Sequence, residues 1–374
     1  MAVGVHRNAR VVIDRSALYH NIHAEYQRLN PQTRLFMVVK ANGYGHGAVE
    51  VARVAKRAGA SGFCVAILDE ALELRRAGIK EPILVLGITS VKNVPLAARE
   101  RVSLTVSSAE WLTQASRVLR NSSVNRRLRV HLGLDTGMGR IGFQTRTGLR
   151  KALQEFHQYP DQLDFEGIFT HFATADSPRD HYFKLQLRRF RQLMTWVKPR
   201  PKFVHVSNSA TSLWHQACNG NLIRYGAAGY GLNPSAGALK PPFTLAPAMS
   251  VETVLSYVKR IRAGRSVGYG ATYTAAHDQW IGTVPIGYAD GVRRSCRGFH
   301  VLVNGHFCPI VGQVCMDQFM VRLPQRLAPG TRVTVIGANG GHRITLQQMA
   351  DYCHTIHYEI ACGFTNRLPR VYVN

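Results

Sequence analysis

Apolar runs of strand length recur eight times in the first 225 residues, and segments with helical character separate them. The runs are 35–39, 63–67, 83–86, 102–106, 128–134, 165–170, 203–206 and 222–225. Eight strand–helix repeats match the size of a closed parallel (β/α) barrel. A doubly wound open sheet is the alternative, because alternation alone does not show closure. The count of eight favours the barrel.

The composition changes between residues 233 and 247 to Pro, Gly and Ala, as in a linker. Short β-rich runs punctuated by turn residues follow at 250–258, 280–286, 299–303, 308–311, 319–323 and 332–336, with one helix candidate at 346–352. The sequence therefore predicts an α/β chain with two domains. An N-terminal parallel (β/α)8 TIM-like barrel takes residues 1–240, and a C-terminal mostly-β domain takes residues 241–374.

The totals agree with two globular domains. The chain has 374 residues, of which 45% are hydrophobic and 18% charged, so it can bury a sizeable core. No apolar run approaches membrane-spanning length, and the first residues lack the apolar region of a signal peptide. We therefore expect a cytoplasmic protein that does not bind a membrane.

Cysteines and charge exclude other classes. The seven cysteines are scattered singly with no Cys-x-x-Cys pair, which indicates reduced thiols and neither a zinc site nor a disulfide framework. The formal net charge is +25, but the cations are dispersed and no run of five occurs. This pattern favours attraction of anionic metabolites over specific nucleic-acid binding.

Lys40 stands directly after the apolar run 35–39, and three alternating glycines follow it. A lysine that leaves a buried strand can lose hydration, which lowers the pKa of its amine and makes it a nucleophile or base. The alternative is a lysine that reaches solvent from a strand end. Position alone favours this second interpretation, and the glycines match neither a P-loop nor a dinucleotide fingerprint.

Polar residues follow several of the other predicted strands. Barrel enzymes carry their chemistry at the carboxyl ends of the strands and commonly bind phosphate after strands seven and eight. The residues found at such ends are Lys40, Arg140 within 135–140, His171, Ser209 after Asn208, and Arg224 with Gly226 and Ala227. Each of these residues, taken singly, also has a purely structural explanation. Ser209, for example, is well suited to cap the helix that follows it. Together they fit a cofactor that carries a phosphate and an aldehyde.

Nine separated motifs resemble those of the alanine racemases, in order along nearly the whole chain. They are VVKANGYGHG at 38–47, DTGMGRIG at 135–142, THFATAD at 170–176, NS at 208–209, Arg224 with YG at 230–231, YGATY at 269–273, PIGYADG at 285–291, CMD at 315–317 and RLPR at 367–370. The resemblance implies an N-terminal barrel, a C-terminal β domain and a head-to-tail homodimer with shared active sites. It also implies the cofactor pyridoxal 5'-phosphate and an amino acid substrate.

The resemblance further implies a two-base racemisation of alanine. Lys40 would hold the cofactor as a Schiff base and serve one face of the substrate α-carbon, and Tyr269 of the partner subunit would serve the other. A free tyrosine has a pKa near 10, so neighbouring groups must stabilise its phenolate. Arg140 and His171 match the residues that support this tyrosine, and Arg140 also binds the substrate carboxylate.

The remaining site residues are carried over from the same motifs. Arg224 matches the residue that faces the pyridine nitrogen, where related decarboxylases have an acidic residue. Tyr44, Ser209, Gly226 and Ala227 match residues that contact the cofactor phosphate. Met316 matches a residue that contacts the substrate, and Tyr288 and Asp317 match residues that line the entry to the site. No metal is implied. The expected product is D-alanine for peptidoglycan.

Two positions depart from the common pattern. Many family members carry a carbamylated lysine where this chain has Gly133, and another anion such as chloride is a candidate substitute. Asn366 replaces a frequent tyrosine at the cofactor phosphate, which makes a serine or broad-specificity racemase the alternative function. A non-catalytic pyridoxal-phosphate carrier would resemble the first domain only, so Tyr269 and Met316 speak against it.

Overall fold

A computed structural model describes residues 2–374, which form two compact units. The unit called here the barrel unit comprises Ala17–Gly43 and Ala48–Ala246. The unit called here the β unit comprises the residues up to Ser16, Tyr44–Gly47 and Pro247–Asn374. The β unit is therefore assembled from segments that are distant in sequence, whereas the barrel unit is nearly continuous.

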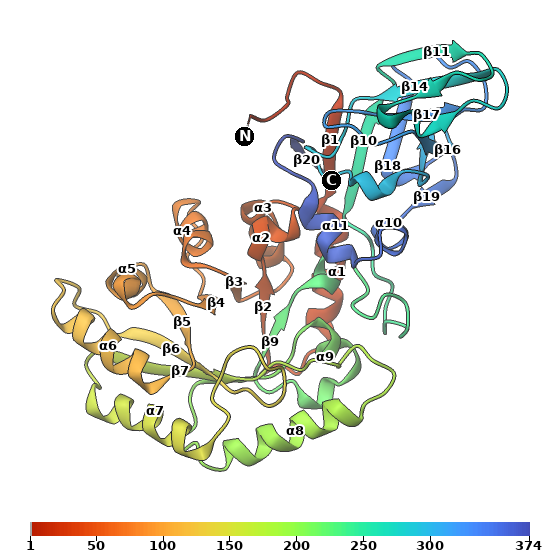
Figure 1. Ribbon diagram of the computed structural model, residues 1–374. Coiled ribbons are helices and arrows are strands. Elements are labelled where there is room, and N and C mark those ends of the chain that lie inside the picture. The colour runs from red at the N-terminus through yellow and green to blue at the C-terminus, as the bar shows by residue number, and fades with distance from the viewer. Residues whose placement is uncertain (1) are drawn as a thin grey trace. The chain divides into compact units, whose positions relative to one another are not determined.

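The barrel unit contains a parallel eight-stranded sheet in the order β8-β7-β6-β5-β4-β3-β2-β9 (Figure 1). Its strands are β2 (Arg34–Val38), β3 (Gly62–Val65), β4 (Ile83–Ile88), β5 (Val102–Val106), β6 (Leu128–Gly133), β7 (Leu163–Phe169), β8 (Phe203–His205) and β9 (Leu222–Tyr225). A parallel bridge between Ser207 and Ile223 joins the two ends of this order. The sheet is thus a nearly closed barrel, and the predicted eight-stranded architecture is confirmed.

Helices alternate with these strands (Figure 1). They are α1 (Arg15–Arg28), α3 (Ala48–Arg57), α4 (Leu68–Arg76), α5 (Val94–Arg99), α6 (Ala109–Arg120), α7 (Arg146–Gln158), α8 (His181–Met194) and α9 (Ser209–Trp214). The local cause is clear in α6, where Leu112, Ala115 and Leu119 are buried at helical spacing. The Ser108 side chain accepts a hydrogen bond from the backbone N–H of Trp111 and begins the helix.

The β unit is built on a ten-stranded sheet whose main path is β11-β14-β17-β16-β15-β18-β10-β1-β20, with β19 paired to β18. Its strands are β1 (Ala9–Asp14), β10 (Met249–Val254), β11 (Tyr257–Ile261), β14 (Gln279–Val284), β15 (His300–Val303), β16 (His306–Val311), β17 (Phe319–Leu323), β18 (Arg332–Asn339), β19 (His342–Ile344) and β20 (Arg370–Val373). A two-stranded ribbon of β12 (Ser266–Val267) and β13 (Tyr273–Thr274) accompanies helices α10 (Leu346–Tyr352) and α11 (His357–Gly363).

The β unit differs from the sequence expectation at several elements; strands β12, β13, β19 and β20, for example, were not predicted. The run 250–258 is two strands, β10 and β11, separated at Leu255 and Ser256. Helix α11 was not predicted. Strand β1 was not predicted either; it pairs antiparallel with β10 and parallel with β20. Six residues of strand at the start of a chain carry too little periodicity to reveal a partner more than 200 residues away.

Candidate functional site

Lys40 lies two residues after the end of strand β2, close to the strand end at which it was predicted, and the backbone that follows it is unusual. The segment α2 (Lys40–Tyr44) has left-handed dihedral angles, with φ of 52° at Ala41, 52° at Asn42 and 53° at Tyr44. Non-glycine residues pay about 1–2 kcal/mol each for this conformation. Strain of this kind persists only where surrounding contacts enforce it, and it concentrates at functional sites.

Two side chains hold this turn. The Glu70 carboxylate accepts a hydrogen bond from the backbone N–H of Ala41 at 2.6 Å and another from Ala66 at 2.7 Å. Asn42 accepts from the backbone N–H of Ala48 at 2.9 Å. Glu70 thus ties the residue after Lys40 to the end of β3. The sequence analysis missed this role of Glu70, because a glutamate in the first turn of a helix usually only caps it.

Gly45 and Gly47 have positive φ angles of 79° and 98° and tolerate no side chain. A Cβ at Gly45 would lie 2.4 Å from the carbonyl oxygen of Ala361, and one at Gly47 would meet the Tyr372 hydroxyl. Gly45 is therefore required by close approach to the backbone of the β unit, and Gly47 by the Tyr372 side chain of the same unit.

Arg224, at the end of β9, is buried, and its two Nη atoms contact groups at the ends of β7 and β8. Its Nη1 lies 2.5 Å from Nδ1 of His205, and its Nη2 donates to the carbonyl oxygen of Thr170 at 2.9 Å. Burial is the main cause that lowers the pKa of Arg224 to about 10; Cys64 opposes this shift and the charge of Arg140 adds to it. The guanidinium therefore stays cationic at neutral pH and acts only as a donor.

His171 lies at the same end of the barrel. Its Nδ1 is 3.4 Å from Nη2 of Arg224, and its Nε2 is 3.5 Å from Nδ2 of Asn208. Burial lowers the pKa of His171 well below its usual range, and the charges of Arg224, Arg140 and Lys40 lower it further. His171 is thus a neutral imidazole among three cations. Lys40, Arg140 and Arg224, which follow or end three other strands, are thus all close enough to His171 to act on its charge. The predicted residues of four strand ends therefore lie near one another.

Cys64, at the end of β3, adds to this picture. Burial raises the pKa of its thiol to about 12, and the nearby charges of Arg224 and Lys40 act against that rise. The thiol is therefore protonated and inert at neutral pH. Strand pairing gives the matching geometry: Cys64 is in register with Val38 of β2, two residues before Lys40, and Arg224 is in register with Phe36 of the same strand.

Ser209 begins α9, next to the loop that follows β9. Its Oγ accepts hydrogen bonds from the backbone N–H groups of Gly226 at 2.8 Å and Ala228 at 3.3 Å. Asn208 caps the helix by accepting from the Thr211 N–H at 2.9 Å. Asn208, and not Ser209, is therefore the residue that caps the helix. The structure brings Ser209 and Gly226 together, with Ala227 between the two bonded backbone groups.

A chain of buried polar groups continues from Arg224 into the barrel. His205 Nε2 lies 2.9 Å from His131 Nδ1, and His131 Nε2 lies 3.1 Å from Oε2 of Glu166. The Ser103 hydroxyl donates to the same carboxylate oxygen at 2.5 Å. Burial alone would raise the pKa of Glu166, but the hydrogen bonds from His131 and Ser103 outweigh it and lower the pKa. Sequence reasoning missed this chain, because its members lie within the predicted strands and not after them.

The other predicted site residues belong to the β unit. Tyr44 is buried, with its ring centroid 6.0 Å from that of Tyr358. Tyr269 and Met316 are 71% and 52% exposed. The Asp317 carboxylate accepts from Arg367 at 2.8 Å, and the backbone N–H of Tyr288 donates to the Cys315 carbonyl at 3.0 Å. The motifs 285–291, 315–317 and 367–370 therefore meet within this unit.

The two unusual positions are both accommodated. A Cβ at Gly133 would have ordinary contacts, the nearest at 3.6 Å from Phe169, so glycine is not required there by packing. Asn366 is exposed in the segment that precedes Arg367. Within residues 2–374, no three His, Cys, Asp or Glu side chains form a cluster suited to a metal ion. None of the helices described has the length and apolar character to cross a membrane.

Comparison with known proteins covers both units. Residues 13–234 match the model of the alanine racemase N-terminal domain, and residues 248–372 match that of the alanine racemase C-terminal domain. A curated alanine racemase of Levilactobacillus brevis is 62% identical over 372 residues, covering 100% of both chains. The crystal structure of alanine racemase from E. faecalis is 51% identical, with a TM-score of 0.96 and 100% of both chains covered. A histidine racemase from Leuconostoc mesenteroides is 35% identical, with a TM-score of 0.94 and the same coverage.

The nine motifs, the barrel followed by a β unit, and both family matches agree over the full length of the chain. This chain belongs to the alanine racemase family of isomerases.

Proposed function

We propose that this protein interconverts L-alanine and D-alanine with pyridoxal 5'-phosphate as cofactor, supplying D-alanine for peptidoglycan. The observation that carries the proposal is the convergence of Lys40, His171 and Arg224 at one end of the barrel. An amine, a neutral imidazole and a buried cation suit a cofactor with an aldehyde and a ring nitrogen.

The residues present fit this cofactor. Lys40 is the amine that would bond to its aldehyde carbon. The Ser209 hydroxyl and the backbone of Gly226 and Ala227 would hold the phosphate, and their observed adjacency supports this role. Tyr44 is the proposed fourth phosphate contact. Arg224 would face the pyridine nitrogen and donate to it.

The cofactor supplies an electron sink that acidifies the α-hydrogen of the bound amino acid. The protein side chains then decide where the proton goes. Lys40 would accept or return a proton on one face of the α-carbon, and Tyr269 of the partner subunit would do so on the other. Arg140 would bind the substrate carboxylate, and Arg140 with His171 would orient Tyr269.

Arg224 favours racemisation over decarboxylation. A guanidinium at pKa about 10 does not accept a proton at neutral pH, so the ring nitrogen it faces would remain unprotonated. The electron sink is then weaker, which limits the lifetime of a carbanion and its side reactions.

A head-to-tail homodimer completes the proposed site. Large exposed side chains in the β unit, Tyr269 and Met316 among them, suit burial against a second copy. Met316 would contact the substrate there, and Tyr288 and Asp317 would line its entry.

The deciding experiment follows D-alanine as the purified, cofactor-loaded protein is incubated with L-alanine. We expect equal amounts of the two enantiomers at equilibrium, from either starting enantiomer. A yellow protein that carries the cofactor and yields no D-alanine would refute the proposal.

Serine or broad-specificity racemisation is the second candidate. Asn366 offers less bulk than the tyrosine frequent at this position, and a relative of the same fold is a histidine racemase. The measurement is D-serine formed from L-serine at enzyme levels that equilibrate alanine. If none is detected, the pocket is restricted to alanine.

A further inference from the structure

A basic cavity of about 500 Å³ opens at the end of the barrel opposite to Lys40. It is lined by Ala98, Arg101, Val102, Arg126, Arg127, Arg129 and Asp164. Val102 is the first residue of β5, and Arg126 to Arg129 span the start of β6. Because the strands are parallel, these amino ends lie on the face away from the strand ends that carry Lys40, His171 and Arg224. The cavity is therefore separate from the proposed active site.

The positive charge of this cavity is poorly compensated. Four arginines and one aspartate line it. In the part of the chain that the structure describes, the side chains of Arg101, Arg126 and Arg127 take part in no hydrogen bond or ion pair. Arg129 lies 3.9 Å from Glu166, whose carboxylate already accepts from His131 and Ser103. Three guanidinium groups therefore face the cavity with all their donors available.

The backbone under these arginines is held in place. Arg75 donates from Nε to the carbonyl oxygen of Glu100 at 2.8 Å and from Nη2 to that of Arg101 at 3.0 Å. Its Nη1 donates to the carbonyl oxygens of Ile79 and Glu81 at 2.7 and 2.9 Å. Arg101 itself has a φ of 53°, a conformation that needs such support. Arg75 thus holds the backbone of Arg101 in place at the edge of the cavity.

The electrostatics around Arg75 agree with an excess of positive charge. Burial lowers the pKa of Arg75, and the charges of Arg129 and Arg101 lower it as well. The charges of Glu100 and Glu81 act in the opposite direction and raise this pKa. Like charges gathered in one concavity repel each other, so a bound anion would relieve a cost that the free protein carries.

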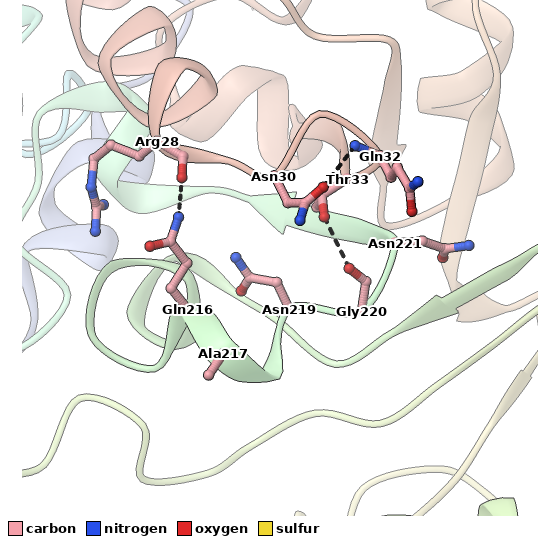
Figure 2. A pocket seen from close by; sticks show the side chains of 9 residues that line it. All are labelled: Arg28, Asn30, Gln32, Thr33, Gln216, Ala217, Asn219, Gly220 and Asn221. Carbon is pink, nitrogen blue, oxygen red and sulfur yellow. Dashed lines mark hydrogen bonds between the residues drawn. The ribbon is translucent and has the colours of Figure 1, made fainter.

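A second cavity at the same end of the barrel provides a contrast (Figure 2). It is of similar size, about 510 Å³, but it is lined by a single arginine, and several of its amide side chains are already paired. Asn219 accepts from the Ser207 hydroxyl at 2.7 Å, and Asn221 accepts from the Val204 N–H at 2.9 Å. Gln216 donates to the carbonyl oxygen of Arg28, as Figure 2 shows. Several polar side chains of this cavity therefore have partners within the protein, whereas those of Arg101, Arg126 and Arg127 in the arginine cavity do not.

We propose that the arginine cavity binds a small anion with two or more phosphate groups. Guanidinium groups pair bidentately with phosphate oxygens, and several of them converge here. The concave shape favours a small molecule over an extended polymer. The lining contains no aromatic ring on which a base could stack, which disfavours single-stranded nucleic acid.

The test is calorimetric titration of cofactor-loaded protein with pyrophosphate at fixed ionic strength, with inorganic phosphate as comparison. Loaded protein is used so that the proposed cofactor phosphate site at Ser209 does not contribute. We expect pyrophosphate to bind more tightly than phosphate, because it can engage more than one arginine. The Arg126→Gln/Arg127→Gln variant should weaken pyrophosphate binding at least about tenfold. Folding should be unaffected, because neither side chain forms a bond in the protein.

The matched control is Arg150→Gln/Lys151→Gln, which removes two exposed cations from α7 outside the cavity. Its affinity for pyrophosphate should stay within about twofold of the unchanged protein, since distant exposed charges are screened. Equal losses in both variants would mean a non-specific charge effect and would overturn the proposal. The proposal would also be overturned if pyrophosphate did not bind at all. The same holds if the protein bound duplex DNA through Arg126 and Arg127 but did not bind pyrophosphate.

Discussion

Arg224 Nη1 lies 2.5 Å from Nδ1 of His205, and this contact fixes the hydrogen positions of the groups behind it. Because a guanidinium only donates, His205 Nδ1 accepts and its Nε2 carries the proton. His205 then donates to His131 Nδ1, and His131 donates from Nε2 to Glu166. This series of hydrogen bonds runs in one direction, from the Arg224 cation at the proposed site to the buried Glu166 carboxylate. Burial, aided by the charge of Arg224, lowers the pKa of His205 well below its usual range, which keeps it neutral.

Replacing His205 should separate the loss of this acceptor from the loss of bulk. His205→Leu removes the imidazole acceptor of Arg224 Nη1, which then keeps only the backbone carbonyl oxygen of residue 205 at 3.3 Å. This loss should cost about 1–3 kcal/mol in the free energy of unfolding. His205→Gln retains an acceptor oxygen and should be less destabilised. Urea unfolding of the two variants provides the comparison. Equal stabilities would show that Arg224 does not depend on this acceptor.

Much of the barrel could be predicted from the sequence, because its strands are continuous apolar runs between helices. Strands β5 and β9 match their predicted bounds, 102–106 and 222–225. Strand β1 could not be predicted, since its identity depends on pairing with β10 and β20 and not on its own pattern.

The site was predictable only where its residues follow strands or match motifs. Lys40, His171, Ser209 and Arg224 fall at strand ends, and the structure brings them together. His131, Glu166 and His205 lie inside strands, where a polar residue in an apolar run gives no indication of its partners. Glu70 was missed for a different reason: its contact with Ala41 depends on the left-handed turn, which no local pattern predicts.

The left-handed turn after Lys40 predicts an unusual stabilising substitution. Ala41 is exposed at a φ of 52°, so Ala41→Gly removes backbone strain without loss of packing. The relief exceeds the entropic cost of glycine, and the free energy of unfolding should rise by about 0.5–1 kcal/mol. Ala24→Gly in α1 is the control, where right-handed backbone predicts a loss of about 1 kcal/mol. Denaturant midpoints measure both. A destabilised Ala41→Gly protein would contradict the inference that the backbone at Ala41 is strained.

Asp290 organises the β unit around a buried carboxylate. It accepts from two guanidinium nitrogens of Arg7, from the backbone N–H of Gly287 at 3.0 Å, and lies 3.3 Å from Nε of Arg367. Asp290→Asn leaves Arg7 without a counter-charge, whereas Arg367 keeps its ion pair with Asp317. The substitution should cost about 3 kcal/mol in the free energy of unfolding, near the lower end for a broken buried pair, because both arginines are partly exposed. Asp278→Asn breaks the exposed pair with Arg260 and should cost less than about 1 kcal/mol. Thermal unfolding distinguishes them, and equal losses would contradict the argument.

His357 predicts a loss of stability in mild acid. Its Nδ1 lies 2.7 Å from Oε1 of Gln347, whereas its buried Nε2 has no hydrogen-bond partner. Protonation would create an unpaired buried N–H, and burial lowers the pKa of His357 to about 4.

An unfolded histidine titrates near 6.5, so below that pH the unfolded chain binds more protons than the folded one. The contribution of His357 to stability is therefore present above about pH 6.5 and is lost progressively as the pH falls toward 4. Between pH 7 and 5, the free energy of unfolding should fall by about 1–2 kcal/mol more than in His357→Gln. Parallel pH profiles of the two proteins would refute the assignment.

Tyr269 tests the proposed two-base reaction. If Tyr269 of the partner subunit serves one face of the α-carbon and Lys40 the other, Tyr269→Phe should retain the cofactor and slow racemisation by about 10²–10⁴-fold, the usual contribution of a positioned base. Exchange of the α-hydrogen with deuterated solvent should be lost from one enantiomer more than from the other. Tyr257→Phe, another exposed tyrosine of the same unit, is the matched control and should change neither rate. A non-catalytic carrier would instead bind the cofactor in every variant with no activity to lose. A Tyr269→Phe protein that remains dimeric and racemises alanine at the unchanged rate would exclude Tyr269 as the second base.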